Sequence, residues 1–300
     1  MRARVAVIAA AAMILLAGCA AGSTPRASGS ALRVVATTTV FADLVRSVGG
    51  DRVVVDSLVP KGGDVHTFDP KPSDIARVAD AQLVVANGLG LDDWLARLAS
   101  DAGTTAPVVR LAAGVPADRY IVEAGLPNPH LWLDPDAAAA YAGAIATALG
   151  RVDQAGAATF TANAAAFDAK LAELKRWGSD LVATLPQDRR TLVSFHDALP
   201  YFARAFGLHI AGVIVKAPGQ DPSASDIAGL VDAIRSSHVH VVVSEVQFSD
   251  KLARTVADET GATIVSDLYD DSLGDPPVDS YDALMRYDLQ RLVTGLKGTG

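Results

Sequence analysis

The stretch ATFTANAAAFDAKLAELKRW, residues 158–177, is the strongest indication of architecture in this 300-residue chain. It contains neither glycine nor proline and is rich in strong helix formers. Residues that recur at steps of three and four make one face of this helix mainly apolar: Phe160, Asn163, Ala164, Phe167, Leu171 and Leu174. A helix of about seven turns would be roughly 40 Å long. We therefore predict a stiff connection, residues 153–185, between two folded lobes.

Short apolar runs rich in β-branched residues alternate with amphipathic stretches on both sides of this helix. Four runs precede it, LRVVATTT, RVVVDSLV, AQLVVANG and APVVRLA, and four follow it, RTLVSFH, HIAGVIV, HVHVVVSE and ATIVSDL. Such runs, separated by helices, are typical of parallel strands that are covered on both faces. We predict an α/β fold of two lobes with parallel sheets, over residues 32–152 and 186–300.

A short internal similarity suggests that the two lobes are related. PSDIARVADAQLVVANG begins at Pro72 and SASDIAGLVDAIRSSHVHVVVSE begins at Ser223, and each places Ser-Asp-Ile-Ala at a helix start before a buried strand. In the second segment Ser223 precedes Asp226 by three residues, which is the spacing of a capping pair. A four-residue match in an alanine-rich chain can arise by chance, so it suggests a repeat without establishing one.

Residues 1–18 have the features of a secretory signal peptide. Arg2 and Arg4 precede an apolar run of thirteen residues, which is shorter than the roughly 20 residues of a membrane-spanning helix. The run ends in LLAGCA, which resembles a bacterial lipobox. This likeness implies that Cys19 is acylated, becomes the first residue of the mature protein and anchors it to a lipid membrane. A conventional signal peptide cleaved within residues 20–22 is the alternative.

The composition behind this leader narrows the function further. Residues 19–31 form a polar tether with glycine, serine and proline. Cys19 is the only cysteine, so a disulfide and a cysteine-ligated metal are excluded. The formal charge is −8, and removal of Arg2 and Arg4 leaves 24 basic against 34 acidic residues, or −10. This balance argues against nucleic-acid binding and against purely electrostatic attachment to an anionic membrane. We expect an extracytoplasmic, lipid-anchored protein.

Three of the six histidines lie just past apolar runs, where a parallel strand would give way to a loop. They are His66 in GGDVHTFDPKPSD, His130 in GLPNPHLWLDP and His196 in TLVSFHDALPYF. Asp271 follows GATIVSDL in the same way, and the separations along the series are 64, 66 and 75 residues. Ligands of zinc fingers and HExxH helices are clustered instead. Wide spacing is expected when strand ends from two lobes converge at the carboxyl edge of open α/β sheets.

Three imidazoles and one carboxylate suit a divalent transition metal, because zinc binds imidazole nitrogen and accepts a carboxylate as the fourth ligand. We predict a metal site in the cleft between the lobes, formed by His66, His130, His196 and Asp271. Asp270 is the main alternative to Asp271, since adjacent loop residues cannot be ordered from sequence. Glu245 in VVVSEVQFS also ends an apolar run. It is a candidate partner of a ligand histidine, a candidate ligand or a structural residue.

At this point the chain resembles the solute-binding lipoproteins of bacterial zinc and manganese ABC importers, a family also described as metal-binding adhesin lipoproteins. Five segments are similar in the same order: DVHTFDPKPSDI, NPHLWLDP, SFHDALPYFARAFGL, SEVQFSDKLARTVADETGA and LYDDSLGDPPVDSYDALMRYDLQRL. The likeness covers residues 32–296. It implies the same four metal ligands and two α/β lobes joined by one rigid helix.

The resemblance also implies a role and partners. It implies a receptor, acting without turnover, that delivers a metal to a membrane permease and its ATPase; we expect a monomer. Members of the manganese type are similar but have glutamate at the position of His196. A nitrogen-rich set favours Zn²⁺ over Mn²⁺, which prefers oxygen. We therefore predict zinc, with manganese as the alternative, although the chain lacks the histidine-rich loop of many zinc members before His130.

Two other functions remain to be weighed against the receptor. A zinc hydrolase would need an open position for water and a general base, for which Glu245 is a candidate. However, the sequence contains neither an HExxH nor an HxHxDH motif. An adhesin that uses the fold as a scaffold is the third possibility, and a surface lipoprotein could combine both roles.

Overall fold

The structure is a computed structural model that describes residues 31–298, except residues 124, 217–218 and 238. The predicted signal peptide, the lipidation site Cys19 and nearly all of the tether lie outside the described residues. Among the residues that are described, no helix is both long and apolar enough to cross a membrane.

Two four-stranded parallel sheets form the framework, and all eight predicted runs are strands. The first sheet has the order β2-β1-β3-β4 and consists of β1 (Leu32–Ala36), β2 (Val53–Ser57), β3 (Leu83–Ala86) and β4 (Val108–Arg110). The second has the order β10-β9-β7-β8 and consists of β7 (Thr191–His196), β8 (His209–Val215), β9 (Val241–Glu245) and β10 (Thr263–Leu268). Both sheets read 2-1-3-4 when their strands are numbered along the chain, so the two lobes share one topology.

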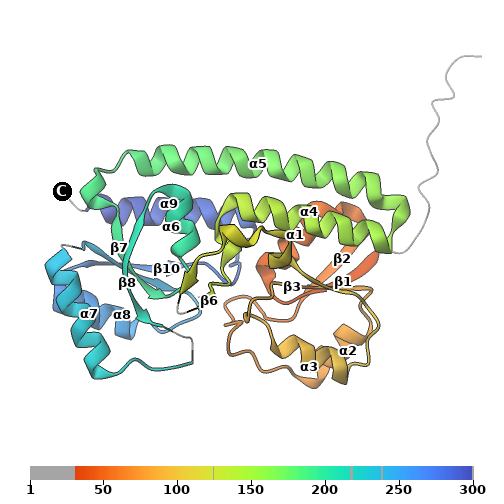
Figure 1. The fold of residues 1–300 in the computed structure, drawn as a ribbon, viewed down its shortest axis with the longest axis horizontal. Helices are drawn as coiled ribbons and strands as arrows, with labels where there is room; N and C mark the ends of the chain where they lie inside the picture. Colours follow the sequence, from red (N-terminus) through yellow and green to blue (C-terminus); the bar gives the residue numbers. More distant parts are fainter. Residues whose placement is uncertain (1–30, 124, 217–218, 238, 299–300) are drawn as a thin grey trace, which may run out of the picture. The chain divides into compact units, whose positions relative to one another are not determined.

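Helices cover both faces of the first sheet, which forms the N-lobe (Figure 1). Val34 and Ala36 of β1 face one hydrophobic core, and Val35 between them faces another, as the alternation of a strand requires. The first of these cores contains residues of α1 (Thr39–Gly49) and α4 (Pro135–Val152). The second contains residues of α2 (Pro72–Ala79) and α3 (Trp94–Asp101).

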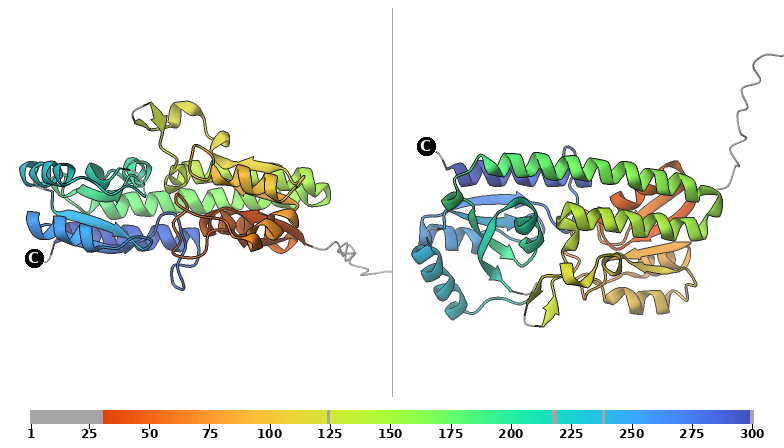
Figure 2. Two further views of the ribbon diagram at one scale, coloured as in Figure 1. Left: turned by 90° about the horizontal axis from the view of Figure 1, so that it is seen from below. Right: turned by 45° about the horizontal axis from the view of Figure 1, so that its top comes forward.

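The second sheet, which forms the C-lobe, is covered in the same way (Figure 2). Leu192 of β7 faces the core that it shares with α6 (Pro200–Phe206) and α9 (Tyr281–Lys297). Val193 and Phe195 point to the opposite face, where they pack with residues of α7 (Ala224–Ser237) and α8 (Lys251–Thr260). Each sheet is therefore the middle layer of three.

The long helix α5 (Ala157–Ala183) runs along both lobes (Figures 1 and 2). Its 27 residues correspond to about 40 Å, and it packs on α1 and α4 of the N-lobe and on α6 and α9 of the C-lobe. One hydrophobic core runs beneath it without interruption from the first sheet to the second. The predicted two-lobe α/β fold with a long connecting helix is confirmed, whereas the lobe boundaries at 152 and 186 stay predictions.

The two similar Ser-Asp-Ile-Ala segments occupy equivalent places in the lobes. Each begins a helix, α2 or α7, that connects the second strand of its sheet to the third. The N–H of Lys71 donates to Asp74 Oδ2 (2.7 Å), and the N–H of Ser223 donates to Asp226 Oδ2 (3.2 Å). Ser223 Oγ in turn accepts from the N–H of Asp226, so the predicted capping pair is present.

The segment between β4 and α4 contains a small hairpin that the sequence patterns do not predict. Its strands β5 (Val122–Glu123) and β6 (Leu126–Pro127) are two residues long and antiparallel. A strand of two residues is too short to produce a periodic pattern. Short 3₁₀ helices occur at η1 (Gly50–Arg52), η2 (Leu111–Gly114), η3 (Ala117–Arg119), η4 (Leu131–Leu133), η5 (Gln154–Gly156) and η6 (Gln187–Arg189).

Candidate metal site

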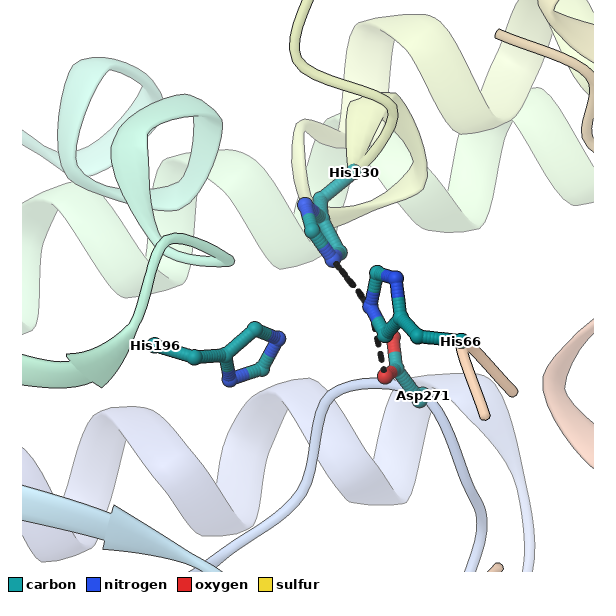
Figure 3. A group of neighbouring side chains, drawn as sticks. All are labelled: His66, His130, His196 and Asp271. Carbon is teal, nitrogen blue, oxygen red and sulfur yellow. Dashed lines mark hydrogen bonds and ion pairs between the residues drawn. The ribbon is translucent and has the colours of Figure 1, made fainter. Parts of the chain in front are cut away.

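Four side chains that are far apart in sequence meet between the two lobes (Figure 3). His66 lies in the loop between β2 and α2, and His130 directly precedes η4. His196 is the last residue of β7, and Asp271 lies in the loop that follows β10. One ligand atom from each residue lies within 4.8 Å of the others. The structure thus brings together all four residues of the predicted site.

His130 reaches this place by a different route from the one we expected. We expected it at the end of a parallel strand, but β4 ends at Arg110 and the β5–β6 hairpin intervenes. The connection of about twenty residues after β4 leaves the sheet before it returns through Asn128 to His130 and η4. Our expectation that His130 follows a strand end is therefore wrong, because a long connection with two 3₁₀ helices and a hairpin separates it from β4.

The distances between the ligand atoms match those around a small metal ion. His66 Nε2 lies 3.4 Å from Asp271 Oδ2 and 3.3 Å from His130 Nε2. His130 Nε2 lies 3.8 Å from Asp271 Oδ1. Ligand atoms placed tetrahedrally at 2.0 to 2.2 Å from an ion are about 3.3 to 3.6 Å from one another. The spacing of His66, His130 and Asp271 therefore fits three ligands of one ion, and a ring nitrogen of His196 lies within 4.8 Å of their ligand atoms.

Local hydrogen bonds hold the loop that carries His66. The N–H of His66 donates to Asp64 Oδ1 (2.9 Å), two residues earlier. Trp94 Nε1 on α3 donates to the carbonyl oxygen of Val65 (3.0 Å), which ties the loop to the N-lobe. The His66 side chain is 15% exposed, whereas those of His130, His196 and Asp271 are almost completely buried. His66 is thus the ligand candidate nearest to solvent.

Asn128 determines which nitrogen of His130 faces the other ligands. Its Nδ2 donates to the carbonyl oxygen of Asp197 (2.7 Å), so its Oδ1 must act as the acceptor toward His130 Nδ1 (2.9 Å). His130 therefore carries its proton on Nδ1 and presents the lone pair of Nε2 to the site. Our sequence analysis missed Asn128, and the only signal was an amide two residues before a candidate ligand.

The two nitrogens of His196 face different groups. One nitrogen points toward His66 (Figure 3), and the centres of the two imidazole rings are 5.6 Å apart. The other, Nδ1, lies 3.5 Å from Glu245 Oε2 and 3.5 Å from Asp270 Oδ2. Asp270 and Asp271 are thereby separated: Asp271 is grouped with the three histidines, and Asp270 is grouped with His196 and Glu245.

Many polar atoms at this place lack a hydrogen-bond partner among the described residues. They are both ring nitrogens of His196, both carboxylate oxygens of Glu245 and of Asp271, Oδ2 of Asp270 and Oε1 of Gln247. Buried polar groups, and charged groups above all, are normally paired or bound to a metal. Unpartnered atoms of this kind are expected where a cation belongs, so the residues present fit a metal ion.

Burial and neighbouring charges shift the pKa values of these side chains and so set their protonation states before a metal binds. Burial lowers the pKa of His130 well below its usual value, although Asp271 opposes this effect. Burial also lowers the pKa of His196, but the negative charges of Asp270 and Glu245 outweigh burial and raise this pKa to about 10. Burial disfavours the charge of Asp271, yet His66, whose Nε2 lies 3.4 Å from Oδ2, and the other two histidines lower its pKa to about 2. At neutral pH, Asp271 is therefore ionised, His130 is neutral and His196 is protonated.

Asp270 behaves differently from its neighbour. Burial, reinforced by the charge of Asp271, raises its pKa well above the usual value. Its Oδ1 accepts hydrogen bonds from Gln247 Nε2 (2.5 Å) and from the N–H of Asp271 (2.6 Å). Its carbonyl oxygen accepts from Trp132 Nε1 (2.9 Å), which comes from the N-lobe. Asp270 is therefore held by residues of the C-lobe and by Trp132 of the N-lobe.

The chain is similar to known metal-binding proteins along almost its whole length. Residues 34–295 match the family model described as "Zinc-uptake complex component A periplasmic". A manganese-binding lipoprotein, MntA of Halalkalibacterium halodurans, is 31% identical over 286 residues, which cover 94% of this chain and 95% of the relative. The iron-binding protein YfeA of Yersinia pestis is 30% identical over 278 residues, which cover 92% of this chain and 89% of the relative.

The same fold occurs among solved structures. The periplasmic zinc-binding protein TroA of Treponema pallidum superposes with a TM-score of 0.82 and covers 89% of this chain and 99% of its own. Its sequence identity is 23%, so this likeness concerns the fold alone.

Proposed function

This chain belongs to the family of the periplasmic zinc-uptake complex component A, and from this premise we propose that it is an extracytoplasmic receptor for Zn²⁺. One observation carries the proposal: four residues from both lobes, three of them buried, offer ligand atoms that lie within 4.8 Å of one another. Several of their polar atoms are otherwise unpartnered. The ion would be held by His66, His130, His196 and Asp271.

The donor set is the reason for proposing zinc. Three imidazole nitrogens and one carboxylate satisfy a tetrahedral zinc ion, whereas manganese prefers oxygen ligands and a higher coordination number. His130 already has its Nε2 lone pair directed into the site by Asn128. The site is thus prepared for a nitrogen-binding metal before the metal arrives.

Manganese is the second candidate, and two observations favour it. MntA, with which this chain shares 31% identity, is named a manganese-binding lipoprotein. Both oxygens of Asp271 are unpartnered, so this carboxylate could bind in a bidentate manner and supply a fifth ligand atom. A direct competition between the two metals is therefore the decisive measurement.

Delivery to a permease completes the proposed role. Acylation of Cys19 would hold the protein at the membrane surface, and residues 19–31 would act as its tether. We infer that a membrane permease with its ATPase receives the metal from a monomeric receptor. The continuous core beneath α5 opposes a wide hinge motion. Release would therefore depend on small shifts of the lobes or of the loops that carry His66 and Asp271.

The position of Glu245 weighs against a zinc hydrolase. A general base must reach a water molecule bound at the open position of the metal. Glu245 Oε2 lies beside Nδ1 of His196, on the side of the ring that faces away from His66. From there it would support His196 as a ligand and would not contact a metal-bound water.

Elemental analysis and titration test the proposal. The soluble chain from residue 23 onward, purified without chelators, should contain about one zinc per chain, as a single four-coordinate site requires. His66→Ala, His130→Ala, His196→Ala and Asp271→Asn should each weaken zinc binding in a competition titration against a chromophoric chelator. His209→Ala is the matched control, because this exposed histidine begins β8 and is absent from the site. Absence of tightly bound metal in the unaltered chain would refute the proposal.

A further inference from the structure

A second group of metal-binding side chains lies behind His196, within the C-lobe. His196 ends β7, Glu245 ends β9 and Asp270 follows β10, and these three strands are neighbours in the order β10-β9-β7. All three side chains are at most 1% exposed. His196 Nδ1 lies 3.5 Å from Glu245 Oε2 and 3.5 Å from Asp270 Oδ2. These separations match those of ligand atoms around one ion, about 3.3 to 3.6 Å.

The site between the lobes does not account for these atoms. An ion held there would use the nitrogen of His196 that points toward His66, together with Asp271. Nδ1 of His196 would then offer a single proton to the acceptors behind it. Oε2 of Glu245 and Oδ2 of Asp270 both lie 3.5 Å from Nδ1, and neither atom has a hydrogen-bond partner among the described residues. A buried carboxylate without a hydrogen bond is strongly unfavourable.

We propose that His196 Nδ1, Glu245 and Asp270 form a second cation position, built entirely from the C-lobe. Its donors are one nitrogen and several oxygens, which suit a divalent transition metal that prefers oxygen, such as Mn²⁺. Gln247 supports this group, because its Nε2 donates to Asp270 Oδ1 and holds that side chain in place. The position lies deeper in the C-lobe than the site between the lobes.

The two positions share His196, so one ion occupies one of them at a time. A neutral imidazole has a single lone pair and carries its proton on the other nitrogen. An ion that moves from Nε2 to Nδ1 therefore requires the ring proton to move from Nδ1 to Nε2. In the second position the ion no longer needs His66 or His130. The C-lobe can then keep the metal while the N-lobe ligands withdraw, which would be one step of transfer to a permease. This step rests on the function proposed above.

Removal of the N-lobe ligands isolates the second position. The variant His66→Ala/His130→Ala should still bind Mn²⁺, more weakly than the unaltered chain, as measured by loss of the free Mn²⁺ signal in electron paramagnetic resonance. Addition of Glu245→Gln or Asp270→Asn to this background should weaken the residual binding by about tenfold or more. Addition of Asp271→Asn should cause a smaller loss. Asp267→Asn, an exposed carboxylate on β10, is the matched control and should cause none.

Two results would overturn the second position. One is a folded His66→Ala/His130→Ala variant that binds no Mn²⁺. The other is residual binding that responds to Asp271→Asn more than to Glu245→Gln and Asp270→Asn, since this places the ion between the lobes. Circular dichroism verifies the fold, and the single variant His66→Ala replaces the double variant if the latter does not fold. Failure of the unaltered chain to bind any metal would instead refute the proposed function, so the two failures are distinguishable.

Discussion

Asn128 accepts a hydrogen bond from His130 Nδ1 over 2.9 Å and donates one to the carbonyl oxygen of Asp197 over 2.7 Å. Asp197 directly follows His196, so a single amide joins the neighbourhoods of two ligand candidates from different lobes. Tyr201 Oη on α6 also donates to the carbonyl oxygen of Asn128 (2.9 Å). The orientation of His130 thus depends on the C-lobe as well as on its own lobe.

Replacement of this amide should weaken metal binding without removing a ligand. Asn128→Ala leaves His130 free to rotate and to change tautomer, so zinc affinity should fall by about 10- to 100-fold in a competition titration. Asn128→Asp keeps an acceptor for His130 Nδ1 but places a carboxylate against the carbonyl and carboxylate oxygens of Asp197, so zinc affinity should fall in this variant as well. Asn163→Ala is the matched control, because Asn163 on α5 donates to the carbonyl oxygen of Val48 and not to a ligand candidate. Equal affinities of Asn128→Ala and the control would contradict this role.

Metal binding should release a proton at neutral pH. His196 has a pKa of about 10 without metal, because Asp270 and Glu245 outweigh the effect of burial, and it is therefore protonated at pH 7. A metal binds the neutral imidazole, so it must displace this proton. His130 and Asp271 release none, because their pKa values are lowered and both groups are already deprotonated at that pH. Affinity should accordingly rise by about tenfold per pH unit between about pH 6 and 8.

Calorimetry in buffers with different ionisation enthalpies measures this proton directly. The apparent enthalpy of zinc binding should vary linearly with the ionisation enthalpy of the buffer, with a slope near one proton. The same experiment with His196→Ala should give a slope near zero. A slope of zero in the unaltered chain would show that His196 is neutral before the metal binds.

The metal preference should depend on His196. His196→Glu replaces a nitrogen ligand with an oxygen ligand, which disfavours zinc relative to manganese. We expect the ratio of zinc to manganese affinity to fall by about tenfold or more, because the new carboxylate also lies beside Glu245 and Asp270. His196→Gln, which removes the nitrogen without adding a charge, should lose zinc affinity without gaining manganese affinity. An unchanged ratio in His196→Glu would show that the protein frame, and not this ligand, sets the preference.

The contact of α5 with the C-lobe should be sensitive to one methyl group. A Cβ atom at Gly178 would lie 2.5 Å from Phe206 Cε1 and 2.7 Å from Leu289 Cδ1, so Gly178→Ala should lower the free energy of unfolding by about 1 to 3 kcal/mol. Gly143 lies within α4 and has no atom within 4 Å of such a Cβ. Gly143→Ala should therefore raise stability by about 0.5 to 1 kcal/mol. Denaturant unfolding measures the change in the free energy of unfolding of each variant. A change of the same sign in Gly178→Ala and Gly143→Ala would argue against the close packing of α5.

Much of the fold could be predicted because its signals are local. A buried parallel strand is a short apolar run, and most of α5 is a stretch without glycine or proline, residues 157–177, so β1 and α5 are visible in their own residues. The hairpin β5–β6 was missed because two-residue strands have no period. The position of His130 relative to the strands was also mispredicted, since the long connection after β4 has no periodic pattern that shows where it ends.

The sequence by itself determined the two α/β lobes, the long helix between them and the list of residues able to bind a metal, because these depend on residue type and spacing along the chain. Only the tertiary structure decided which of these residues lie together as ligands of one ion. It grouped Asp271 with three histidines and Asp270 with His196 and Glu245, although the two aspartates are adjacent. The physical reason is that the direction of a loop side chain is set by its partners. Gln247 and Trp132 hold Asp270, and they come from distant parts of the sequence.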